Sequence, residues 1–101
     1  MILHTVLWKL RPSITEEEKA QIRKNAKEHL EALVGVVPSL LSCRVEIAVT
    51  EGSGADMMLQ ATYADEAGLA AYQAHPAHKQ VANTYVRPFV AERLCADCII
   101  E

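Results

Sequence analysis

Residues 2–10 predict a β-strand that is apolar on both faces, and this segment constrains the fold more than any other. Alternate residues of a strand point to opposite sides of its sheet. A strand that is apolar on both sides is typical of a sheet whose two faces are both covered. The row expected to face the helices of the protein comprises Ile2, His4, Val6, Trp8 and Leu10.

The segment after this strand predicts an amphipathic helix. Thr15 and Glu18 have the spacing of a capping box, and the acidic residues at positions 16–18 suit the positive end of a helix dipole. Gly35 is expected to end the helix as its C′ residue. The apolar stripe of the helix has spacings of four, four and three residues, and it comprises Ile22, Ala26, Leu30 and Leu33.

Two further strands are predicted in the middle of the chain. Residues 41–50 alternate between apolar and polar side chains, and residues 57–63 form a third strand. The segment 51–54, Glu-Gly-Ser-Gly, predicts a flexible turn between them. Because this connection is short, the two strands are expected to pair as an antiparallel hairpin. The apolar face of the third strand comprises Met57, Leu59, Ala61 and Tyr63.

The rest of the chain predicts two short helices and a closing strand. Asp65 is expected to cap the first helix. Pro76 is expected to end that helix near His75 and to begin the next one, because proline disfavours helix at the residue before it and fits the first helical position. Pro88 is expected to stop the second helix, ahead of a strand over residues 92–100.

This order of elements predicts the fold class. The length of 101 residues fits one domain over residues 1–101. The order βαββα(α)β predicts an α+β protein of the ferredoxin-like type, with a four-stranded antiparallel sheet and helices on one face. Leu3 and Leu7 would then lie on the uncovered face. Because large exposed apolar patches mark interfaces, we expect a homodimer packed sheet against sheet, a dimeric α+β barrel.

The composition argues against several classes of function. A net charge of -3 and a pI near 5.8 give no electrostatic basis for binding nucleic acid or an anionic membrane surface. No apolar run has the length of a membrane span, and the N-terminal segment lacks the pattern of a signal peptide. Three cysteines, an odd number, predict free thiols in a reducing cytoplasm. Cys95 and Cys98 match the C-x-x-C pattern, but on a strand they would point to opposite faces, which argues against a redox pair.

Residues 72–78, Tyr-Gln-Ala-His-Pro-Ala-His, concentrate groups that can transfer protons. His78 would lie in the first turn of the helix that begins at Pro76. There the helix dipole favours the neutral imidazole, which can act as a base near pH 7. His75 is expected to cap this helix. We predict no metal at His75 and His78, because no further ligand lies at a suitable spacing, and we predict no cofactor, because no cofactor motif occurs.

Residues from the first strand, the broken helix and the closing strand combine in one pattern: His4, Trp8, Tyr72, His75, Pro76, His78, Arg93 and Asp97. This pattern resembles the stress-responsive A/B barrel (Dabb) domain family, and the resemblance covers nearly the whole chain. It implies a dimeric α+β barrel of the ferredoxin-like type. The fold expected from the periodicity of the sequence agrees with this implication.

One branch of the Dabb family consists of plant polyketide cyclases, which close a linear poly-β-ketide by an intramolecular aldol condensation. The resemblance implies a cavity between sheet and helices. It maps the catalytic tyrosine and histidine of these cyclases onto Tyr72 and His78, and a cavity histidine of the first strand onto His4. A further cavity histidine falls at Met57, so that one polar wall of the cavity would be apolar in this chain.

Besides a stress-linked dimer with no pocket at all, two functions stay open at this point. The first is a homodimer of otherwise unassigned role that binds a small hydrophobic or aromatic molecule in the cavity without turning it over. The second is a cofactor-free enzyme, a cyclase, isomerase or monooxygenase, with His78 as base and Tyr72 as hydrogen-bond donor. The side chains expected to contact a ligand are His4, Trp8, Met57 and His75.

Overall fold

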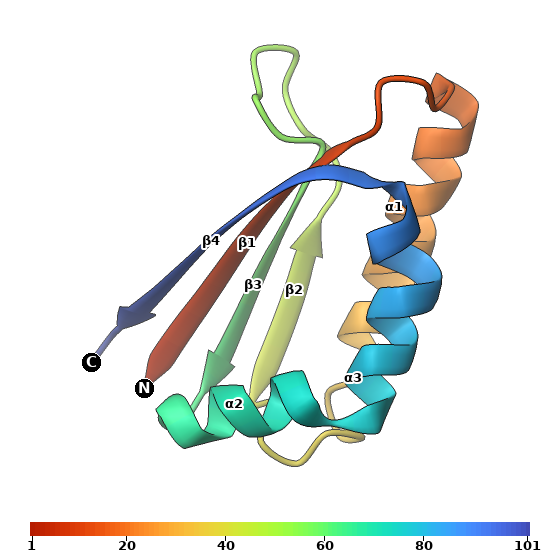
Figure 1. Cartoon of the computed structure of the whole chain (residues 1–101). Helices are drawn as coiled ribbons and strands as arrows, with labels where there is room; N and C mark the ends of the chain where they lie inside the picture. Colours follow the sequence, from red (N-terminus) through yellow and green to blue (C-terminus); the bar gives the residue numbers. More distant parts are fainter.

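The computed structural model describes residues 1–101 and has the predicted order of elements (Figure 1). The third helix continues through a π-helical turn, η1, and a 3-10 turn, η2, before the last strand. The elements are β1 (Ile2–Leu10), α1 (Glu16–Glu31), β2 (Ser42–Glu46), β3 (Met57–Tyr63), α2 (Glu66–Ala74), α3 (Pro76–Val81), η1 (Ala82–Val86), η2 (Arg87–Phe89) and β4 (Val90–Ile99).

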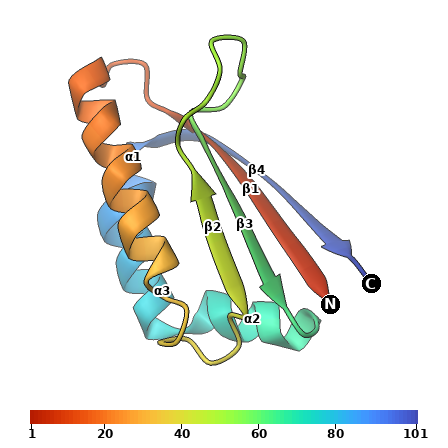
Figure 2. The same cartoon turned by 180° about the vertical axis from the view of Figure 1, so that it is seen from behind.

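The four strands form one antiparallel sheet in the order β2-β3-β1-β4. Figures 1 and 2 show α1 and α3 along one side of this sheet, while α2 crosses near the end where β3 finishes. The opposite face of the sheet carries no helix. The α+β, ferredoxin-like fold predicted from the sequence is therefore confirmed.

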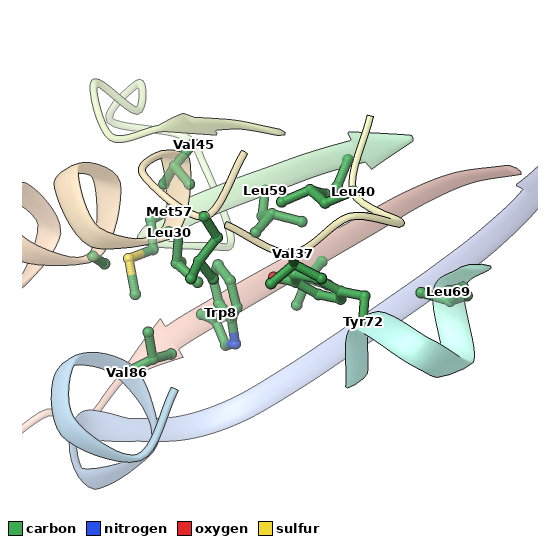
Figure 3. Close-up of a cluster of buried hydrophobic side chains, with 14 of the residues drawn as sticks. Trp8, Leu30, Val37, Leu40, Val45, Met57, Leu59, Leu69, Tyr72 and Val86 are labelled. Atoms are coloured by element: carbon green, nitrogen blue, oxygen red, sulfur yellow. The ribbon is translucent and has the colours of Figure 1, made fainter. Parts of the chain in front are cut away.

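The core lies between the sheet and the helices, on the side predicted from the alternation in β1. All five residues of the predicted row are buried, whereas Leu3 and Leu7 on the opposite face are only partly covered. Alternate residues of β3, from Met57 to Tyr63, are also buried. Apolar side chains of α1 and of the segment after it complete this cluster (Figure 3). His4 is the one polar residue that is buried with them, at 3% exposed.

The end of α1 differs from the prediction. The helix stops at Glu31, so Gly35 is not its C′ residue. Gly35 instead takes a φ of 90° in the turn that follows, where the N–H groups of Val36 and Val37 donate to the carbonyl of Leu33. A left-handed backbone angle of this kind favours glycine. Gly35 therefore has a conformational role in the turn after α1, and not at the end of the helix itself.

The second strand is shorter than the alternation of residues 41–50 predicts. β2 ends at Glu46, which pairs with Met58 near the start of β3. Because β3 begins at Met57, residues beyond position 47 have no strand to pair with, and an unpaired segment cannot continue a sheet. The polar-apolar alternation therefore continues past the end of the hydrogen-bonded strand.

The closing segment also starts earlier than predicted. Pro88 does not end the helical segment, because it sits inside the 3-10 turn of Arg87–Phe89, where the absence of an N–H is tolerated at a helix start. The last strand then begins at Val90 instead of position 92. Its residues pair with β1 along almost the full length of that strand. β4 is therefore the edge strand of the sheet, next to His4 and Trp8 of β1.

The sheet face without helices carries exposed apolar side chains. Leu94 of β4 is 67% exposed and pairs with the partly covered Leu7 of β1. Both point away from the core, because their neighbours along each strand point toward it.

None of the helices is long and apolar enough to cross a membrane.

Candidate functional site

A cavity of about 350 Å³ lies between the sheet and the helices. This volume falls at the lower end of the range of about 300–1,000 Å³ that is typical of small-molecule sites. Seven of the twelve lining residues are hydrophobic, so the cavity combines an apolar body with a few polar groups. The lining residues are His4, Val6, Trp8, Leu30, Leu59, Tyr72, Gln73, His78, Ala82, Val86, Arg87 and Arg93.

The break between α2 and α3 brings Tyr72 and His78 together. His75 has an extended backbone, with ψ at 134°, and its Nδ1 atom accepts a hydrogen bond of 3.1 Å from the N–H of Ala77. Pro76 then begins α3, as predicted. The last turn of α2 and the first turn of α3 consequently face one another, and the ring centroids of Tyr72 and His78 lie 4.3 Å apart.

The surroundings of His78 favour the neutral form of its ring. Its Nδ1 atom lies 3.4 Å from the carbonyl of Gln73, and because a carbonyl only accepts, Nδ1 carries the hydrogen. The other ring nitrogen, Nε2, is then the acceptor. Burial lowers the pKa of His78, and the positive charges of Arg87 and Arg93 lower it further, although the hydrogen bond to Gln73 acts in the opposite direction. The neutral form was predicted from a helix dipole, but in this short helix burial is the larger cause.

Tyr72 is held as a hydrogen-bond donor. Its side chain is only 2% exposed, and burial raises the pKa of its hydroxyl well above the usual value of 10.0. The phenol therefore stays protonated at physiological pH. Its ring packs against that of Tyr63, which does not line the cavity, with centroids 5.3 Å apart. Tyr72 and His78 thus offer a proton donor and a proton acceptor side by side.

His4 enters the cavity from the sheet and pairs with Asp97. The register of β1 and β4 places the two residues opposite one another, and His4 Nδ1 forms a hydrogen bond with a carboxylate oxygen of Asp97. This hydrogen bond is the main reason why the pKa of Asp97 is lowered. A carboxylate only accepts, so Nδ1 of His4 carries the hydrogen of this bond. Asp97 therefore fixes both the tautomer and the orientation of the His4 ring.

Cys95 adds a third potential ligand atom to this pair. Nδ1 of His4, Sγ of Cys95 and a carboxylate oxygen of Asp97 all lie within 4.8 Å of one another. A nitrogen, a thiolate and a carboxylate can hold Zn²⁺. Burial, however, raises the pKa of the Cys95 thiol, and His4 and Asp97 already satisfy one another. The arrangement therefore fits a hydrogen-bonded pair with a neutral thiol beside it better than a metal centre.

The cysteines of the chain and the two histidines of residues 72–78 have the following surroundings. All three cysteines are free, and Cys98 is exposed, on the face opposite to Cys95 as the strand alternation predicts. His75 and His78 bond to different backbone groups, Ala77 and Gln73.

Two of the four residues predicted to contact a ligand line the cavity, and two do not. His4 and Trp8 line the cavity. Met57 is fully buried in the core beside it, and His75 is a helix cap, so neither lines the cavity. Met57 and His75 were predicted to contact a ligand from their positions in the sequence. Those positions do not tell whether a residue lines the cavity or supports the residues that line it.

Sequence reasoning missed the contributions of Gln73, Arg87 and Arg93 to the cavity wall. A signal existed for Arg93, because the alternation that places Leu94 on the outer face places its neighbours on the inner one. No such signal existed for Arg87, since its position depends on the π-helical turn before it.

The model of the stress responsive A/B barrel domain matches residues 2–100. This chain belongs to the stress responsive A/B barrel domain family. The match spans nearly the whole chain, so the Dabb resemblance found in the sequence is confirmed, and the cavity described above is a site within a Dabb domain. No curated protein matches this chain.

Several solved structures share this Dabb fold. A dimeric protein of unknown function from Bacteroides fragilis is 24% identical, with a TM-score of 0.92 over 98% of this chain and 95% of its own. A Dabb family protein from Mesorhizobium loti is 19% identical, with a TM-score of 0.74 over 99% and 96%. A hydroxynitrile lyase from Passiflora edulis is 13% identical, with a TM-score of 0.74 over 99% and 93%. At these identities the likeness concerns the fold alone.

Proposed function

We propose that this Dabb domain binds a small hydrophobic or aromatic molecule in the cavity between sheet and helices. The observation that carries this proposal is a hollow of about 350 Å³ whose lining is mostly apolar but includes a few polar groups. Apolar walls supply affinity for such a ligand, and a small number of polar groups fixes its orientation. Trp8 and Tyr72 are the aromatic side chains in the wall against which a flat ligand can pack.

We further propose that the protein acts as a homodimer in a reducing cytoplasm. The sheet face without helices carries Leu94 and Leu7, and a second copy would cover both. Structural neighbours from Bacteroides fragilis and Thermobifida fusca are described as dimeric, which supports this assembly. The three free cysteines are consistent with a reducing compartment.

Ligand binding is testable through Trp8, because it is the single tryptophan of the chain and lines the cavity. Titration with the neutral aromatic dye N-phenyl-1-naphthylamine should quench Trp8 emission and raise dye emission to saturation. Ala82→Leu should abolish this response, because the larger side chain would occupy the cavity that Ala82 lines. Ala71→Leu is the matched control, since Ala71 is exposed on α2 and is absent from the lining. An equal response from both variants would place the dye elsewhere and contradict the proposal.

A second candidate function is proton-transfer catalysis without a cofactor. The observation that favours it is the contact between a neutral His78 and a protonated Tyr72 at the cavity wall. In an aldol-type reaction, Nε2 of His78 would remove a proton from the carbon beside a ketone, and Tyr72 would donate a hydrogen bond to the enolate oxygen. The enolate carbon would then bond to a second carbonyl carbon, and the resulting alkoxide would take up the proton held on Nε2 of His78, which returns the ring to its neutral form. The hydroxynitrile lyase of Passiflora edulis shares the fold, although fold alone does not assign chemistry.

Proton exchange separates this function from simple binding. In D₂O the protein should exchange the methyl protons of acetophenone for deuterium, as followed by NMR. His78→Ala should stop the exchange, whereas His29→Gln should not, because His29 stacks on Tyr85 and does not line the cavity. If the wild-type protein binds the dye but exchanges no protons, binding stands and catalysis is rejected.

A further inference from the structure

The charged groups of the cavity wall are all of one sign. The lining contains Arg87 and Arg93, together with two histidines, and it contains no Asp or Glu. This is not a reflection of the whole chain, which has 13 acidic residues against 10 basic ones and a net charge of -3. Positive charge is therefore concentrated at the cavity of an otherwise acidic protein, and a cleft focuses such a field.

The two arginines reach the cavity from different elements. Arg87 is the first residue of η2, and Arg93 lies in β4 opposite Trp8. The positive charge of each contributes to the lowered pKa of His78, so both guanidinium groups act on the same point of the cavity. Arg87 and Arg93 therefore belong to the wall of the same cavity as Tyr72 and His78.

Both guanidinium groups keep N–H donors that no carboxylate of the chain accepts. No carboxylate forms a salt bridge with Arg87 or Arg93, and the hydrogen bond of Arg87 goes to the neutral side-chain oxygen of Asn83, at 2.6 Å. The positive charge of Arg93 helps to lower the pKa of Asp97, but Asp97 does not line the cavity and its carboxylate is bonded to His4. Each guanidinium has five N–H donors, most of which remain available.

We infer that the cavity takes an amphipathic carboxylate, whose anionic group is bound by Arg87 and Arg93 while its apolar body fills the space beside Trp8. This inference rests on the proposed binding function and names the class of ligand. Guanidinium groups bind carboxylates through paired, charge-assisted hydrogen bonds, which a neutral ligand cannot match. The apolar lining contributes affinity for the rest of the molecule, so an aromatic acid with a short alkyl chain suits both parts of the wall.

The test compares 4-butylbenzoate with 4-butylbenzamide, which have the same shape but different charge. Isothermal titration calorimetry near neutral pH should give a dissociation constant for the benzoate at least about tenfold lower than for the amide. Arg87→Gln and Arg93→Gln should each reduce this preference, and the double variant should remove it. Arg44→Gln is the matched control, because Arg44 is exposed on β2, is paired with Glu46, and does not line the cavity.

The outcomes distinguish this inference from the proposed function. Equal binding of benzoate and amide would overturn the anion inference and leave small-molecule binding standing. A preference for benzoate that survives in the Arg87→Gln/Arg93→Gln double variant would also overturn it. If neither compound binds and N-phenyl-1-naphthylamine gives no Trp8-dependent signal, the proposed function fails together with the inference. Loss of the preference in the arginine variants alone, with amide binding unchanged, would support the assignment.

Discussion

The rings of Tyr72 and His78 lie with their centroids 4.3 Å apart, although a break between two helices separates them in the chain. The contact depends on His75 and Pro76, which end one helix and begin the next. On a continuous helix, residues six apart would lie on different faces. The break therefore places a donor and an acceptor beside each other at the wall of one cavity.

His78 should titrate below its ordinary pKa of 6.5, because burial disfavours its charged form. The unfolded chain then binds more protons than the folded one between the lowered pKa and 6.5, so the free energy of unfolding should fall as the pH decreases through that window. Proton exchange of acetophenone should weaken over the same range, because the protonated ring is no longer a base. NMR titration of the ring proton resonances gives the pKa directly.

His78→Gln is the control for this pH dependence. The variant keeps a polar side chain but removes the titrating group, so this part of the stability slope should disappear in urea denaturation at several pH values. A measured pKa of His78 at or above 6.5 would contradict the expected direction.

Tyr72→Phe should separate chemistry from packing. The ring that packs on Tyr63 is kept, so the free energy of unfolding should change by less than about 1 kcal/mol. If Tyr72 holds the enolate oxygen, the rate of proton exchange should fall by about 10²–10³-fold, as for other lost oxyanion donors. Binding of N-phenyl-1-naphthylamine should persist. An exchange rate equal to that of the wild type would remove Tyr72 from the reaction.

Asp97→Asn should disturb the orientation of His4. An amide in place of the carboxylate no longer fixes the hydrogen on Nδ1, so affinity for polar aromatic ligands should drop several-fold. Because the Asp97 side chain is 42% exposed, the loss of stability should be no more than about 1 kcal/mol. The ring resonances of His4 report the tautomer. Glu92→Gln on the outer face of β4 serves as the matched charge control and should change neither property.

Leu94→Glu should weaken the proposed homodimer. A charge on the outer sheet face would have to be buried when two sheets pack, and that is costly without a partner. Analytical ultracentrifugation should show the dimer dissociation constant rising by at least about tenfold. Ile99→Glu is the matched control: Ile99 is 81% exposed on the same strand, but it pairs with Ile2 and lies on the helix side. Equal effects of the two variants would argue against sheet-to-sheet packing.

The broken helix shows how much of the site local sequence specifies. Proline limits the backbone at His75 and suits the first helical position, so the break and the placement of His78 in a first turn were predicted and are confirmed. The neutrality of His78 was also predicted, but its main cause was not, because burial depends on residues that are distant in the chain. Met57 and His75 show the same limit, since their positions alone do not tell whether they line the cavity or support it.

The sequence by itself determined which residues of β1 and β3 face the helices, because side chains alternate along any strand and one face must leave water. It also determined the order of elements, and through it the ferredoxin-like sheet. Only the tertiary structure decided that Asp97 meets His4 and that Arg93 and Arg87 share a cavity with His78. Those pairings follow from strand register and from the angle between helices, which are set by packing among residues far apart in the chain.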